Sequence, residues 1–154
     1  MTGLHKGIAG LGHFDGKTHL LPLRVYYEDT DLSGMVYHAN YLRYMERART
    51  EFFRSAGVSR MADLESPEPT AWTLTHADVR FHRPARLDDA LTVLTTLTAI
   101  SGVRINAHQR VMCADALLVE ARIEACIVTL TGRPRRLPEE VARALAPFLL
   151  DSGA

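Results

Sequence analysis

The 154-residue chain has little cysteine, no excess of either charge and no long apolar run. Its two cysteines, Cys113 and Cys126, are too few for a disulfide-stabilised miniprotein, and neither has the spacing of a zinc site. Eighteen Lys and Arg residues balance eighteen Asp and Glu residues, so the basic excess of a typical nucleic-acid-binding protein is missing. The lack of an apolar window of about 18 residues argues against a membrane span. We therefore expect a cytoplasmic protein with two reduced, structural thiols.

What the chain does contain is the composition of one globular domain, with 47% hydrophobic and 23% charged residues. Five of its ten glycines lie in residues 1–20, and this density predicts a flexible N-terminal arm there because glycine loses much backbone entropy on ordering. The folded domain is predicted over residues 21–150. The glycines of residues 7–12 do not indicate a dinucleotide site, since no strand precedes them and no helical pattern follows.

Apolar residues recur in patterns that predict one strand, one long helix and then four more strands. Alternation predicts the first strand over residues 21–28. Spacings of three and four predict a helix over residues 39–56. Its expected apolar face consists of Tyr41, Met45, Ala48, Phe52 and Ala56, widened by Leu42 and Phe53. The four later strands are predicted at about residues 71–82, 91–100, 103–113 and 117–130.

Short breaks at residues 101–102 and 114–115 favour tight antiparallel hairpins, because parallel strands need much longer connections. A short helix is predicted over residues 138–146, with proline at its start and acids in its first turn. The expected fold class is α+β: an antiparallel sheet of about five strands with one face covered by the long helix.

The residues able to carry chemistry gather in residues 26–41, between the first strand and the helix. Free backbone N–H groups and the positive end of the helix dipole would lie near His38, and both would stabilise an oxyanion. A carboxylate just upstream could activate water. This pattern fits a hydrolase for a carbonyl substrate. The alternative is that Asp29 and Asp31 only form turns and caps, and that His38 is an ordinary polar residue at a helix start.

Other arrangements are less well supported by the residue pattern. Ser33 lacks the Gly-x-Ser-x-Gly context of a nucleophile elbow, and a triad with Asp31 and His38 is disfavoured. His76 and His82 have no evident third ligand. We therefore expect neither a metal ion nor an organic cofactor.

The segment Tyr-Tyr-Glu-Asp-Thr-Asp-x-x-Gly-x-Val-Tyr-His-Ala-Asn-Tyr, residues 26–41, resembles the signature of the 4-hydroxybenzoyl-CoA thioesterase family. It is most similar to the acyl-CoA thioesterases associated with the Tol–Pal system. The resemblance continues in residues 46–51, 81–89 and 134–138, and so covers about residues 22–146. Leu32-Ser33 departs from the pattern, because small residues such as Ala-Gly are common there. These two residues border the expected acyl site.

The resemblance implies a hotdog fold, in which a sheet wraps around a long helix, and hydrolysis of an acyl-CoA thioester. Asp31 matches the catalytic aspartate, acting as base or nucleophile, and the N–H of His38 matches the group that polarises the thioester carbonyl. The His38 imidazole could orient water or substrate. Side chains implied to line the site are Tyr27, Asn40 and Glu46.

Two basic runs, residues 82–86 and 133–136, are candidates for the phosphates of CoA, through Arg83, Arg86, Arg135 and Arg136. The alternative is that they are solvated turns. Acyl carrier protein is an alternative carrier of the acyl group. Edge strands and the family resemblance predict a homodimer or homotetramer, with Asp31 of one chain facing the helix start of its partner. A non-catalytic acyl-binding or scaffold protein on the same fold, and a hotdog dehydratase, are the competing functions.

Overall fold

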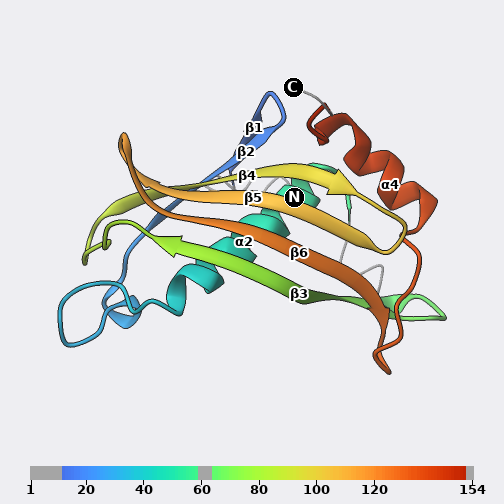
Figure 1. The fold of residues 1–154 in the computed structure, drawn as a ribbon, viewed down its shortest axis with the longest axis horizontal. Coiled ribbons are helices and arrows are strands. Elements are labelled where there is room, and N and C mark those ends of the chain that lie inside the picture. Colours follow the sequence, from blue (N-terminus) through green and yellow to red (C-terminus); the bar gives the residue numbers. More distant parts are fainter. Residues whose placement is uncertain (1–11, 59–63, 152–154) are drawn as a thin grey trace, which may run out of the picture.

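The computed structural model describes residues 12–58 and 64–151, which form a six-stranded antiparallel sheet with the long helix α2 against one face (Figure 1). The strand order is β1-β2-β4-β5-β6-β3. The strands are β1 (His13–Asp15), β2 (Thr18–Arg24), β3 (Thr70–Phe81), β4 (Ala90–Ile100), β5 (Arg104–Cys113) and β6 (Ala116–Thr129). The helices are α2 (Asn40–Ser55) and α4 (Glu139–Leu145), with 3-10 turns η1 (Tyr27–Asp29) and η2 (Ala146–Phe148). The predicted α+β class, the long helix and the four later strands are confirmed.

Helix α2 buries one face against the sheet, as its apolar spacing predicts. The residues of α2 that are buried are Tyr41, Tyr44, Met45, Ala48, Phe52 and Phe53. The prediction that Leu42 belongs to this face is wrong, because 39% of its surface is exposed. Tyr44, which the predicted face omitted, is 1% exposed instead. The buried face therefore exchanges Leu42 for Tyr44 and keeps most of the predicted residues.

The N-terminal part of the domain differs from the prediction. Residues 13–20, expected in the flexible arm, form β1 and the start of β2, and residues 1–11 of that arm lie outside the described residues. Phe14 explains the ordering, since its ring stacks on Phe148 at 3.8 Å and meets Phe52 edge-on at 4.9 Å. The arm prediction is thus wrong for residues 13–20, and the sheet gains a sixth strand.

The first predicted strand also ends early. It was expected to reach residue 28, but β2 ends at Arg24 and the chain turns into η1. The Asp29 carboxylate accepts the Tyr26 N–H at 2.8 Å, and such a local side-chain bond competes with strand pairing. The chain therefore leaves the sheet just before the predicted site.

Strand β3 is the long edge of the sheet and runs beside α2. Its last residue, Phe81, has its ring 5.8 Å from that of Tyr41 near the start of α2. Its third residue, Trp72, stacks on Phe53 near the end of α2 at 5.3 Å. Helix and strand are therefore antiparallel neighbours. The middle of β3, from Thr73 to Asp78, is exposed.

Two expectations about the rest of the chain can be compared with the structure. Cys113 and Cys126 are both free, and Cys126 is buried in the sheet, as expected for structural thiols. Among the described residues, no helix is long and apolar enough to span a membrane.

Candidate active site

Residues 30–36 form a tight loop that places Asp31 in front of the start of α2. Thr30 pairs with Val36, and Met35 pairs with Arg86 at the end of the β3–β4 connection. The Asp31 N–H donates to the Met35 carbonyl at 3.0 Å, and the Gly34 N–H donates to the Asp31 carbonyl at 3.0 Å. Gly34 adopts φ of 78°, a left-handed conformation that glycine adopts without a steric penalty. The loop is thus fixed on both sides by backbone hydrogen bonds.

The two aspartates of this segment have different surroundings. Asp29 is buried, and its carboxylate accepts the Tyr26 N–H, so it has the capping role that turn chemistry predicts. Asp31 is exposed, and its Oδ1 accepts the Ser33 N–H at 2.8 Å and the Ser33 hydroxyl. These bonds from Ser33, together with the charge of His38, lower the pKa of the Asp31 carboxyl. Asp31 is therefore a solvent-accessible carboxylate at neutral pH.

The start of α2 offers an unengaged backbone donor next to this loop. The N–H groups of Asn40, Tyr41 and Leu42 already donate to the carbonyls of residues 37, 38 and 39. The His38 N–H, in contrast, donates to no acceptor among the residues that the structure describes. It lies at the positive end of a 16-residue helix. A negative oxygen placed there would gain a hydrogen bond and a favourable dipole.

The side chains around His38 come from the loop, the helix and β3. The His38 ring lies 4.5 Å from the Tyr37 ring and 6.3 Å from the Phe81 ring, measured between centroids. Asn40 does not point to open solvent, since its Nδ2 donates to the Asp29 carbonyl at 2.9 Å and ties the helix to the loop. Tyr27 is 83% exposed on η1. Asp31 lies close enough to His38 of the same chain for the two to interact electrostatically. The pairing of Asp31 with the helix of a partner stays a prediction.

The predicted binding residues fall into separate places within one chain. Arg86 lies beside the Asp31 loop through its pairing with Met35, and Arg83 lies in the same connection. Arg135 lies near the other end of β3, where it forms an ion pair with Glu68. Glu46, two turns into α2, lines a cavity of about 220 Å³ between α2 and β3. One chain therefore brings Asp31, His38 and Arg86 together but not Arg135.

Three contributors were missed by sequence reasoning. Ser33 was considered as a nucleophile and as a departure from the family pattern but not as a partner of Asp31, yet its hydroxyl donates to Asp31. Arg49 and Gln109 form a polar contact beneath α2, with Nη1 2.9 Å from Oε1. The sequence could have indicated this bond of Ser33, because Ser33 places a hydroxyl two residues after Asp31. The partnership of Arg49 and Gln109 joins residues 60 positions apart, so it had no sequence signal.

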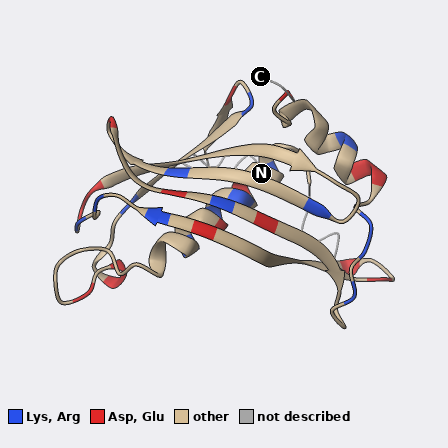
Figure 2. Cartoon of the chain, viewed as in Figure 1, with Lys and Arg blue, Asp and Glu red and all other residues tan. Residues whose placement is uncertain are grey.

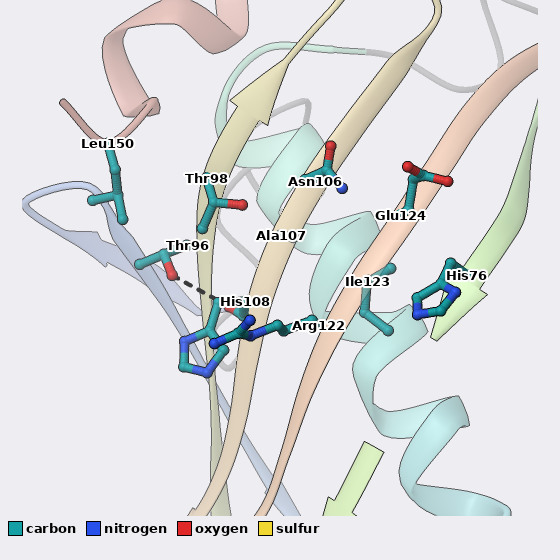
Figure 3. Close-up of a pocket in the computed structure, with 10 residues that line it drawn as sticks. All are labelled: His76, Thr96, Thr98, Asn106, Ala107, His108, Arg122, Ile123, Glu124 and Leu150. Carbon is teal, nitrogen blue, oxygen red and sulfur yellow. Dashed lines mark hydrogen bonds between the residues drawn. The ribbon is translucent and has the colours of Figure 1, made fainter. Parts of the chain in front are cut away.

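The opposite face of the sheet holds a larger hollow that contains none of the predicted site residues. It measures about 430 Å³ and lies over β4, β5 and β6 (Figure 3). Lys or Arg positions and Asp or Glu positions are neighbours on adjacent strands of the sheet (Figure 2). Asp78 lies opposite Arg122, and Arg80 lies opposite Glu120, in the β3–β6 register. Among the described residues, no cluster of His, Cys, Asp and Glu could hold a metal ion.

Comparison with known proteins agrees with this architecture. The model of the thioesterase-like superfamily matches residues 25–145. The acyl-CoA thioester hydrolase YbgC of Escherichia coli O157:H7 is 41% identical over 122 residues, which are 78% of this chain and 90% of that protein. The acyl-CoA thioesterase YbgC of Haemophilus influenzae is 38% identical and covers 80% of this chain and 90% of its own.

A solved structure gives the same fold. The 1,4-dihydroxy-2-naphthoyl-CoA thioesterase from Synechocystis superposes with a TM-score of 0.76 at 26% identity, over 84% of this chain and 96% of that one. The hotdog fold implied by the residues 26–41 signature is confirmed. The chain belongs to the thioesterase-like superfamily, and its relatives there include the YbgC acyl-CoA thioesterases.

Proposed function

We propose that this chain hydrolyses acyl-CoA thioesters to the free acid and CoA, with Asp31 and the His38 N–H as the reacting pair. The observation that carries the proposal is the juxtaposition of an ionised, exposed carboxylate and a free amide at a helix start. The carboxylate can activate the nucleophile, and the amide can donate a hydrogen bond to the oxyanion that forms in acyl transfer. The family relationship supports the same activity.

In the general-base route, the thioester carbonyl accepts a hydrogen bond from the His38 N–H. Asp31 removes a proton from water while the water oxygen attacks the carbonyl carbon. The resulting oxyanion stays at the helix start until the C–S bond breaks and the CoA thiolate leaves, taking up a proton. In the alternative route the Asp31 carboxylate itself attacks, and water then hydrolyses the mixed anhydride. Ser33 serves both routes by keeping Asp31 ionised and oriented.

The experiment that tests the proposal is an acyl-CoA hydrolysis assay on Asp31→Asn. This change keeps the size of the side chain and removes the base, so the rate should fall by about 10²–10⁴-fold. Asp15→Asn is the matched control, because Asp15 is also exposed but lies in the β1–β2 hairpin. Near-normal turnover by Asp31→Asn would remove Asp31 from the mechanism. A protein that binds acyl-CoA but never hydrolyses it would be the non-catalytic alternative.

A single-turnover reaction in ¹⁸O-water separates the two routes. If Asp31 is the nucleophile and water attacks the Asp31 carbonyl carbon of the mixed anhydride, the label enters the Asp31 carboxylate in that turnover, and mass spectrometry of the digested protein would detect it. If Asp31 is the base, the label goes only to the free acid. His38→Ala should cost less than Asp31→Asn, because the backbone N–H remains.

We further propose a homodimer that pairs two β3 edges around a two-fold axis. The exposed middle of β3 is a long row of unpaired backbone groups, which soluble proteins cover. Leu32 and Phe81, 109% and 53% exposed beside the site, would be covered by the same contact. Antiparallel pairing would bring the Arg135 end of one chain to the Asp31 end of the other, so the CoA phosphates would be bound by Arg83 and Arg86 of one chain and Arg135 of its partner.

A complementation assay tests this shared site. Asp31→Asn chains and Arg135→Ala chains each lose activity at low acyl-CoA, but a mixed dimer retains one site with both residues intact. Refolding the two together should therefore restore activity, and light scattering should show no species at the 17.1 kDa of one chain. A fully active monomer would contradict the shared site. A cytoplasmic location fits the two free cysteines.

A further inference from the structure

The cavity between α2 and β3 combines an apolar wall with one half-buried cation, Arg49. Phe53 from α2 and Trp72 from β3 line it, and their rings stack at 5.3 Å with an interplanar angle of 17°. Arg49, Glu46 and Thr50 line the helix side. At roughly 30 Å³ per water-sized group, a volume of about 220 Å³ holds about seven non-hydrogen atoms. The cavity is therefore sized for a short chain or a single ring.

The Arg49 side chain is half-buried between α2 and the sheet, and its guanidinium is held there by a hydrogen bond. Its Nη1 donates to Oε1 of Gln109 at 2.9 Å, and Gln109 is 0% exposed. The Gln109 amide is itself fixed, because its Nε2 donates to the Met45 carbonyl and to the Thr95 hydroxyl, each at 2.9 Å. With both hydrogens of that amide engaged, Oε1 must face Arg49. The sheet thus aims the guanidinium at the cavity.

The charge of Arg49 is not neutralised by an ion pair. Among the described residues, no carboxylate lies within ion-pair distance of it, and Gln109 is neutral. Burial lowers the pKa of the guanidinium, and Glu46 raises it from a longer distance. A desolvated cation without a partner is costly, and an anion bound beside it would relieve that cost. The planar fork of an arginine suits a carboxylate in particular.

The cavity lies along the path that an acyl group would take from the active site. Glu46 is six residues after Asn40, which is about 9 Å along a helix with a rise of about 1.5 Å per residue. Strand β3 follows the same line, from Phe81 beside His38 to Trp72 beside Phe53. An acyl group whose carbonyl lies at the His38 N–H can therefore extend beside α2 into the cavity.

We propose that this cavity binds the far end of the acyl group and that Arg49 selects acyl groups carrying a carboxylate at that end. The inference rests on the proposed function, since it assumes that the acyl carbonyl lies at His38. Glu46 shares the wall and opposes an anion, so it sets the strength of the preference. Gln109 is a positioning residue, because it acts only through Arg49.

A binding experiment tests the cavity without requiring hydrolysis. Trp72 is the only tryptophan of the chain, so its fluorescence reports on the cavity. Titration of the intact protein with butyrate should give a saturable change, and the isosteric neutral amide butyramide should give none. Arg49→Met should abolish the response, and Arg49→Lys should retain a weaker one. An equal response to butyrate and butyramide, or none to either, would overturn the proposal.

A kinetic experiment tests the selectivity. The two substrates are a long-chain acyl-CoA that ends in a carboxylate and its methyl-ended counterpart of equal length, long enough to span the roughly 16 Å of helix from His38 to Arg49. A charge-assisted hydrogen bond of about 1.5–3 kcal/mol corresponds to roughly 10–150-fold in kcat/KM, and Arg49→Met should lose that preference for the carboxylate substrate. Arg49→Lys should keep part of it, and Glu46→Gln should increase it. An equal loss for both substrates would mean that Arg49 is merely structural, which overturns the proposal. If the unmodified protein hydrolyses neither substrate, the proposed function is contradicted instead. The fluorescence titration would then still show whether the cavity binds a carboxylate.

Discussion

Lowering the pH from 7 to 5 should destabilise this protein through a single buried histidine, His19. The side chain is 0% exposed on β2, packed against Phe14 and Phe52, and its Nε2 lies 3.3 Å from the Ser55 hydroxyl. Its Nδ1 has no hydrogen-bond partner in the structure. Burial, and secondarily the charge of His13, lowers the pKa of His19 from 6.5 to about 4. The folded protein therefore keeps this imidazole neutral where the unfolded chain protonates it.

The magnitude follows from linkage between protonation and folding. Above pH 6.5 both states hold a neutral imidazole, and His19 gives no pH dependence. Between pH 6.5 and pH 4 only the unfolded chain binds the proton, so stability falls as the pH falls. The full loss below pH 4 is about 3.5 kcal/mol, from the difference between 6.5 and about 4 at roughly 1.4 kcal/mol per pKa unit. At pH 5 the loss is about 2 kcal/mol.

Urea unfolding at a fixed protein concentration, repeated at intervals between pH 7 and pH 5, measures this dependence. His19→Gln removes the titrating group, so its free energy of unfolding should fall by about 2 kcal/mol less between pH 7 and pH 5 than that of the unmodified protein. This comparison holds even if the substitution lowers the stability at pH 7. His76→Asn is the control, because His76 is exposed on β3 and its replacement should leave the slope unchanged. If His19→Gln has the same slope as the unmodified protein, then the imidazole is not held neutral by burial and the reasoning is wrong.

Three further outcomes are expected. Ser33→Ala should raise the pKa of Asp31, because the hydrogen bond from the Ser33 hydroxyl is the largest cause of its lowering. The acid limb of the profile of kcat/KM against pH should therefore move to higher pH. If that limb does not move, Asp31 is not the group that titrates there. Gln109→Leu should reduce the free energy of unfolding by about 1–3 kcal/mol in urea, because Arg49 Nη1 and the buried Thr95 hydroxyl lose this partner. A neutral effect would mean that water replaces these bonds. Neutralising Arg83 and Arg86 together should raise KM for acyl-CoA with little change in kcat, and an unchanged KM would place the phosphates elsewhere.

The sequence by itself determined the elements with long, regular patterns. The apolar spacing of residues 41–53 sets a helix because only a period near 3.6 puts those side chains on one face. The alternation in residues 117–127 sets β6 for the equivalent reason with a period of two. The proposed catalytic group of Asp31, Ser33 and His38 was also visible in the sequence, since the three residues lie close together within residues 26–41. Such local features need no knowledge of the rest of the fold.

Only the tertiary structure decided the features that depend on distant residues. Glycine density predicted disorder for residues 13–20, but Phe14 packs between Phe52 and Phe148 and orders a strand there. Nothing in the local sequence distinguishes Arg49 from the other helix arginines, and its bond to Gln109 joins it to a residue 60 positions later. Arg135 looked equivalent to Arg86 until β3 was seen to separate them. In each case the deciding contact joins residues far apart in the chain, and local pattern holds no information about which distant side chains will meet.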